Sequence, residues 1–131
     1  MAWTVPEHSK SEVDRAGKVL VSEYTTDQAL QTALTVINNW RASHSFPLNT
    51  FQVGLRSKAR RIDDQALVAQ RIKRLSSIEL KLSRFPTMKV SQMQDIGGCR
   101  AVLRNIAQVR ELEQSYRESS IKHKPLRTDD Y

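Results

Sequence analysis

Cationic side chains and hydroxyls are concentrated in one stretch of this chain, residues 71–100. Arg71 and Lys73 are two positions apart, the spacing that puts both side chains on one face of an extended segment. Ser77 and Lys81 are one helical turn apart, so both can point the same way. Guanidinium and ammonium groups that converge in this manner bind polyphosphates. The pattern therefore predicts phosphate chemistry.

A carboxylate, Asp95, lies in the same stretch, two positions before the pair Gly97-Gly98. Carboxylate oxygens suit the magnesium ion that a polyphosphate carries. Both features also have a structural interpretation, because basic residues commonly form a solvated face and an aspartate before two glycines is typical of a turn. On the charge pattern alone, that structural interpretation is favoured.

Two motifs in this stretch resemble the synthetase domain of the RelA/SpoT family, a GTP pyrophosphokinase-like domain. Residues 71–81 (RIKRLSSIELK) are similar to the R-x-K-x-x-x-S-I-x-x-K segment that opens the domain. Residues 95–102 (DIGGCRAV) are similar to the family's D-I-x-G-x-R-x-V strand. The aspartate and tyrosine at 130–131 resemble the D-Y that begins its next strand. The resemblance covers roughly residues 68–131, and it is specific because both longer motifs occur in order.

The family resemblance implies a reaction and a set of binding residues. RelA/SpoT synthetases transfer the β,γ-pyrophosphate of ATP to the 3′-hydroxyl of GDP or GTP, which makes guanosine tetra- and pentaphosphate. Small toxin-type relatives instead pyrophosphorylate the 3′ end of tRNA. By resemblance, Mg²⁺ would bind at Asp95, and no catalytic residue is assigned. The residues that would hold the ATP phosphates are Arg71, Lys73, Ser77, Lys81 and Arg100.

Two parts of the family's site have no match in these 131 residues. One is the tyrosine that stacks on the acceptor base within a G-Y-R-S-x-H segment. The other is a later glutamate, the second metal ligand. We therefore expect the donor half of a site in a chain truncated at its C-terminus, and no turnover by this chain alone. A non-catalytic basic binding module is a further alternative to the two enzyme activities.

Composition and charge indicate the kind of partner. The net charge is +7 and the isoelectric point about 9.9, which favours anionic partners: nucleotides, RNA or an acidic protein. Residues 56–84 carry nine basic and three acidic residues, or +6 of that total. One cysteine excludes an internal disulfide and fits the cytoplasm. No secretory signal and no apolar run of the ~20 residues needed to span a membrane is present, so we expect no membrane partner.

Several other chemistries are excluded by the motifs. The four glycines form neither a P-loop nor a Rossmann fingerprint. The three histidines are scattered and there is one cysteine, so the chain lacks a zinc-binding spacing.

Apolar periodicity and capping residues predict three helices in residues 1–65. The first begins at the capping box Ser9-x-x-Glu12 and ends near residue 21. The second begins at Thr25 and ends near residue 43. A break at residues 44–47 should precede the third, capped by Asn49 or Thr50 and ended by the aspartates at 63–64. Phe51, Leu55 and Ile62 are its predicted inner residues.

The second half of the chain, residues 66–131, should form the N-terminal part of the synthetase domain. We expect a strand at 66–73, a short helix at 76–82, one turn at 91–94 and a buried strand at 99–103. A last helix should run from 105 or 106 to 116, with residues 121–131 a second strand or a frayed tail. The predicted inner residues of this last helix are Ile106, Val109, Leu112 and Tyr116. The fold class is α+β, with N-terminal helices followed by the first part of a nucleotidyltransferase-like mixed sheet, in one compact unit.

Overall fold

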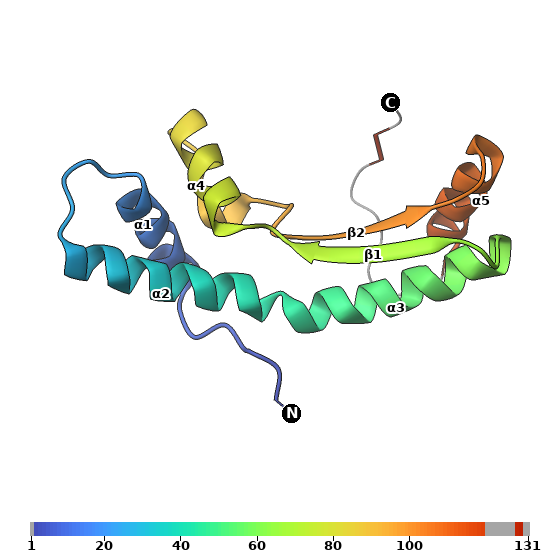
Figure 1. The fold of residues 1–131 in the computed structure, drawn as a ribbon, viewed down its shortest axis with the longest axis horizontal. Helices are drawn as coiled ribbons and strands as arrows, with labels where there is room; N and C mark the ends of the chain where they lie inside the picture. The colour runs from blue at the N-terminus through green and yellow to red at the C-terminus, as the bar shows by residue number, and fades with distance from the viewer. Residues whose placement is uncertain (1, 120–127, 130–131) are drawn as a thin grey trace. The chain divides into compact units, whose positions relative to one another are not determined.

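The computed structural model describes residues 2–119 and 128–129 (Figure 1). The helices and strands, in chain order, are α1 (Lys10–Leu20), α2 (Asp27–Ser43), α3 (Ser45–Ile62), β1 (Leu67–Ile72), α4 (Leu75–Arg84), the 3-10 helix η1 (Val90–Gln92), β2 (Gly97–Val102) and α5 (Ile106–Arg117). β1 and β2 pair as a two-stranded antiparallel sheet. The predicted α+β class is confirmed. The alternatives for residues 121–131, including the D-Y at 130–131, fall almost wholly outside the described residues.

The chain divides into two compact units. The first contains residues 1–50 and 70–98, and therefore holds α1, α2, α4 and η1. The second contains residues 51–69 and 99–131, and holds most of α3 together with α5. Each unit combines segments from both sides of residue 65.

Three helices begin at side-chain caps, two of them at or next to the residue that the sequence predicts. The Ser9 hydroxyl accepts a hydrogen bond from the Glu12 N–H at the start of α1. Thr26, one residue beyond the predicted Thr25, caps α2 in the same way. The Asn105 side chain accepts from the Gln108 N–H and caps α5. Such caps satisfy backbone donors that have no partner within the helix.

The start of α3 differs from the prediction. Neither Asn49 nor Thr50 caps this helix, because it begins at Ser45, directly after the last residue of α2 and His44. Pro47 lies in its first turn, where a backbone N–H would have no helical partner, so the missing proline donor costs nothing there. The residues predicted to break the chain therefore form only a one-residue joint.

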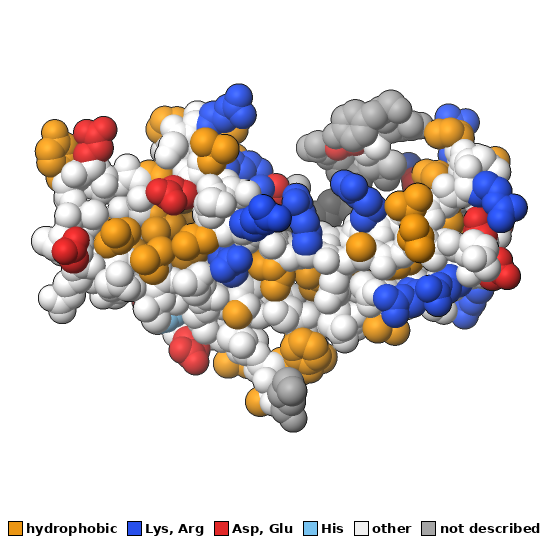
Figure 2. All heavy atoms as spheres, viewed as in Figure 1, with side chains coloured by type: hydrophobic (Ala, Val, Ile, Leu, Met, Phe, Trp, Pro, Cys, Tyr) orange, Lys and Arg blue, Asp and Glu red, His pale blue; other side chains and the backbone are white. Residues whose placement is uncertain are grey.

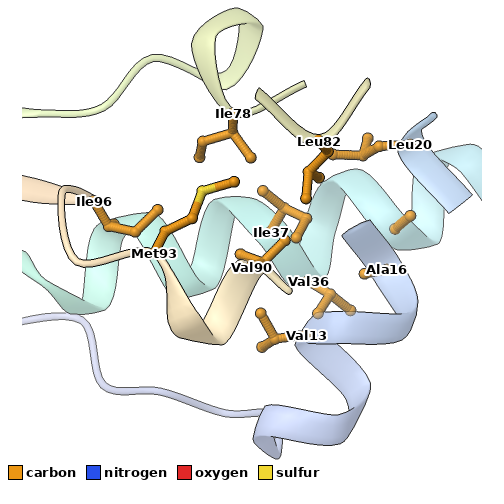
Figure 3. Close-up of a cluster of buried hydrophobic side chains, with 11 residues drawn as sticks. Val13, Ala16, Leu20, Val36, Ile37, Ile78, Leu82, Val90, Met93 and Ile96 are labelled. Atoms are coloured by element: carbon orange, nitrogen blue, oxygen red, sulfur yellow. The ribbon is translucent and has the colours of Figure 1, made fainter. Parts of the chain in front are cut away.

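The first unit has a continuous apolar core (Figure 3). Its largest fully buried side chains include Ile37 of α2 and Ile78 of α4. Burying an aliphatic side chain of this size contributes roughly 1.5–3 kcal/mol. The core fixes α4, η1 and the segment before β2 against α1 and α2. The buried members are Val13, Ala16, Leu20, Ala33, Val36, Ile37, Ile78, Leu82, Val90, Met93 and Ile96.

The second unit has a smaller core, formed by Leu55, Ala59, Ala66 and Leu112. The prediction that Phe51, Ile106 and Val109 point inward is wrong, since all three are exposed. Helical periodicity shows which residues share a face, but a two-stranded sheet and one helix cover only part of each face.

The apolar run at 99–103 predicted a strand buried on both faces, but β2 is partly buried on one face only. Its exposure alternates: Cys99 and Ala101 are partly buried, whereas Arg100 and Val102 are exposed. A strand covered on one face alternates in this way, and only strands covered on both faces are buried throughout.

Two helical glycines should respond oppositely to alanine. A Cβ on Gly17 would overlap the Val90 side chain and press on Leu82, both buried, so Gly17→Ala should lower the free energy of unfolding by about 1–3 kcal/mol. A Cβ on Gly54 would meet nothing within 4 Å, so Gly54→Ala should raise that free energy by about 0.5–1 kcal/mol. Urea unfolding followed by circular dichroism measures both. Stabilisation by both substitutions would contradict the packing of α1 against Val90.

Candidate anion-binding site

Lys73, just after β1, is held by its backbone on both sides. Its N–H donates to the carbonyl of Ile96 at 2.7 Å. Its carbonyl accepts from Nε of Arg41 on α2 at 2.9 Å. The turn from β1 into α4 is therefore anchored to two other segments of the first unit, and the Lys73 side chain begins from a fixed point.

Arg41 was not singled out by sequence reasoning. It also donates from Nη1 to Oδ1 of Asn38, at 2.9 Å, which holds its guanidinium in place on α2. Arg41 acts here on a backbone carbonyl 32 positions away, and no local spacing indicates such a contact. Its role is to position Lys73.

Two lysines converge on one carboxylate. Nζ of Lys73 lies 2.8 Å from Oδ2 of Asp95, and Nζ of Lys81 lies 3.3 Å from Oδ1. The Lys73 side chain is only 11% exposed, whereas that of Asp95 is 48% exposed. Each carboxylate oxygen thus has its own ammonium partner, and the group opens to solvent on the Asp95 side.

These contacts set the charge state of Asp95. The hydrogen bond from Lys73 lowers the pKa of this carboxyl, the bond from Lys81 lowers it further, and partial burial opposes both. Asp95 is therefore ionised at neutral pH. The site carries two positive charges and one negative charge, a net attraction for an anion.

Ser77 belongs to the first turn of α4, whose N-cap position is occupied by Arg74. An arginine side chain has no hydrogen-bond acceptor, so the Arg74 side chain does not cap this helix. The N–H groups of Ser77 and Ile78 both donate to the Arg74 carbonyl. A helix start without a side-chain cap favours negative charge, because backbone donors and the helix dipole both point toward it.

The remaining predicted residues are Arg71 and Arg100. Arg71 is exposed on β1 in the first unit, and Arg100 is exposed on β2 in the second. Among the described residues of the predicted set, direct contacts join Lys73, Lys81 and Asp95. The phosphate-binding roles predicted for Arg71, Ser77 and Arg100 remain predictions. Figure 2 shows basic side chains gathered over the junction between β1 and α4.

Asp95, the predicted magnesium ligand, suits an ion that is also held by phosphate oxygens and water, more than an ion held by protein groups alone. No group of three or more His, Cys, Asp or Glu side chains gathers within the described part of the chain. Magnesium in nucleotide sites often takes one or two carboxylates, with phosphate oxygens and water completing the shell. Asp95 is ionised and half-exposed, so it suits this arrangement if an ion replaces one lysine contact. Lys81, at 3.3 Å, makes the longer of the two.

Asp95→Asn should remove a pH-dependent contribution to stability. Because the folded state lowers this pKa, the contribution is present above the ordinary carboxyl range near pH 4 and is lost as the pH falls through the lowered value. At pH 7 the free energy of unfolding of the wild-type chain should exceed that of the variant by less than about 1 kcal/mol, since the ion pairs of Asp95 are partly exposed. The difference should vanish toward pH 2 in urea unfolding series. A difference that grows toward low pH would contradict the lysine contacts.

Comparison with protein-family models and with curated proteins finds no match for this chain. None of the described helices is long and apolar enough to cross a membrane.

Proposed function

We propose that the first unit binds the triphosphate of ATP, with magnesium, at Lys73, Lys81 and Asp95. The observation that carries this proposal is the convergence of two ammonium groups on one half-exposed carboxylate. The uncapped start of α4 supports it, because that helix end favours a phosphate over a neutral ligand. Arg71 and Ser77, in the same unit, would add contacts to the phosphates, and Arg100 is the further candidate from the motif.

The reaction proposed for this site is pyrophosphate transfer from ATP to the 3′-hydroxyl of GDP or GTP. The resemblance of residues 71–81 and 95–102 to RelA/SpoT synthetases supports it. In such a transfer the 3′-oxygen bonds to the β-phosphorus, the bond between the β-phosphorus and the oxygen that bridges to the α-phosphate breaks, AMP leaves, and the hydroxyl proton passes to water. Positioning and charge neutralisation provide most of the catalysis. Lys73 and Lys81 would orient the phosphates and balance their charge.

Magnesium at Asp95 would supply further charge neutralisation on the phosphate oxygens. Lys73, held through its backbone by Ile96 and Arg41, would keep its ammonium in place without reorganisation. A cytoplasmic location belongs to the same proposal, since ATP and guanine nucleotides are its ligands.

A magnesium-ATP titration followed by an acceptor assay tests the proposal. Calorimetry should detect ATP binding that weakens when magnesium is chelated and when Asp95 is replaced by Asn. Purified chain with γ-labelled ATP is then assayed for transfer of label to GDP or GTP, and a rate near background is expected because the acceptor half of the site has no match in these residues. Asp95-dependent label on an acceptor would show that the residues present suffice for turnover, and ATP binding without transfer would leave this chain as the donor half of the site. No ATP binding would refute the proposal.

Pyrophosphorylation of the tRNA 3′ end is the second candidate. The observation that favours it is the concentration of charge, since residues 56–84 carry +6 and would attract RNA phosphates. Deacylated tRNA in the same labelling assay separates the two. Label on tRNA but not on GDP or GTP would assign the toxin-type activity.

A further inference from the structure

The second half of α3 carries an unbalanced positive charge. Its basic side chains are Arg56, Lys58, Arg60 and Arg61, and residues 51–62 hold no acid. Within the described part of the chain, no carboxylate forms an ion pair with any of the four. Like charges one turn apart, such as Arg56 and Arg60, destabilise a helix by about 0.2–0.5 kcal/mol.

The helix C-terminus accounts for part of this charge. Cations in the last turn, here Arg60 and Arg61, are stabilised by the helix dipole. That effect decays within one turn, so it does not explain Lys58 or Arg56. A second feature lies on the same helix.

An aromatic pair, one ring exposed and the other partly buried, lies beside Lys58 in the second unit. Phe51 of α3 stacks with Tyr116 of α5, with ring centroids 5.9 Å apart and planes 7° from parallel. Nζ of Lys58 is 5.1 Å from the centre of the Tyr116 ring, a cation–π contact. Phe51 nevertheless remains 53% exposed. A flat apolar surface and a cation are thus presented together to solvent.

Gly54 lies between Phe51 and Lys58 without a structural reason. Its φ is not positive, and a Cβ there would meet nothing within 4 Å. Glycine in a helix interior costs about 1 kcal/mol relative to alanine. Phe51, Gly54, Lys58 and Arg61 follow one another at intervals of three and four residues, so they form one stripe along about 15 Å of the helix.

We propose that this stripe, defined as Phe51, Gly54, Lys58 and Arg61 with Tyr116 beside it, binds single-stranded nucleic acid. A base would stack on Phe51, with its edge over the open surface at Gly54, and Lys58 and Arg61 would contact the following phosphates. Aromatic faces alternating with cations are how proteins hold single strands without reading their sequence. An acidic protein would pair with the cations alone through its carboxylates, whereas a nucleic acid carries both the phosphates for the cations and the flat bases for the ring.

The stripe lies in the second unit and uses none of the residues proposed to bind ATP. It is therefore independent of the nucleotide site, and either proposal can fail alone.

Fluorescence anisotropy with labelled 12-nucleotide oligouridylate and oligothymidylate tests the inference on the full chain. Phe51→Ala should weaken binding about 5- to 150-fold, the range for losing one stacked base. Lys58→Ala should weaken it and should reduce the slope of log affinity against log salt by about 1. Gly54→Ala should weaken binding although it stabilises the helix, which separates contact from folding.

Phe46→Ala is the matched control, because Phe46 is the same residue type on the same helix, 52% exposed, and belongs to the first unit. It should leave oligonucleotide affinity unchanged, and Phe51→Ala should leave ATP affinity unchanged. A preference for the uridylate over the thymidylate would identify RNA, and equal binding would identify single strands in general. Equal affinities of the Phe51 and Phe46 variants, competition by polyglutamate as strong as by unlabelled oligonucleotide, or no binding would overturn the inference.

Discussion

Lys73→Met should weaken magnesium-ATP binding by about 10- to 150-fold, or roughly 1.5–3 kcal/mol, the range for a hydrogen bond to a charged group. The large effect is expected because the Lys73 side chain is only 11% exposed and the backbone of Lys73 is fixed by Ile96 and Arg41. A cation that starts in the correct place loses little freedom when it binds phosphate. Methionine keeps the length of the stem and removes the charge. Isothermal calorimetry measures the change.

The folded state should survive this substitution, since Asp95 keeps its contact with Lys81. A melting temperature close to that of the wild-type chain would establish this. Lys18→Met, at an exposed position of α1, is the matched control and should leave ATP affinity unchanged. Equal losses in both variants would mean that the affinity reflects overall charge and not this site.

Ile78→Ala should lower the free energy of unfolding by about 2–5 kcal/mol. Ile78 is fully buried in the core of the first unit, where it lies among side chains from α2 and the segment before β2 (Figure 3). Alanine removes most of that apolar contact and leaves a cavity that a close-packed interior fills poorly. Urea unfolding followed by circular dichroism measures the loss.

The matched control for Ile78 is Leu80, two residues further along α4. Leu80 is exposed, so Leu80→Ala should change stability by less than about 0.5 kcal/mol. Because Ile78 also fixes the face of α4 that carries Ser77 and Lys81, its replacement should weaken ATP binding even where the chain remains folded. Comparable stability of the two variants would show that α4 does not pack through Ile78.

The helices were predictable wherever short-range interactions define them. The Ser9 and Asn105 caps bond to N–H groups three residues away, and the periodicity of α2 repeats within four. Both partners of each interaction lie within four residues of each other, so the local sequence is enough to predict them. The strand at residues 66–73 was expected from the family resemblance and not from such a signal, because its apolar and polar residues alternate poorly.

The start of α3 was not predictable from residues 44–47, which resemble a helix break. Proline usually ends a helix, yet at Pro47 it lies in the first turn, and only the position of the preceding helix end decides between the two. The exposure of Ile106 and Val109 has a similar origin. Periodicity places them on one side of α5, but whether that side is covered depends on what the rest of the chain puts opposite.

For the candidate site, the sequence by itself determined the residue types: cations and two serines in residues 71–81 and the carboxylate at 95. Only the tertiary structure decided that Lys73 and Lys81 share Asp95, which is 22 and 14 positions away, and that Arg41 holds the Lys73 carbonyl. Contacts over such separations form only after the core of the first unit has brought α2, α4 and the segment before β2 together. Spacing along the chain carries the chemistry of a site, whereas its partners depend on distances that burial of the core sets.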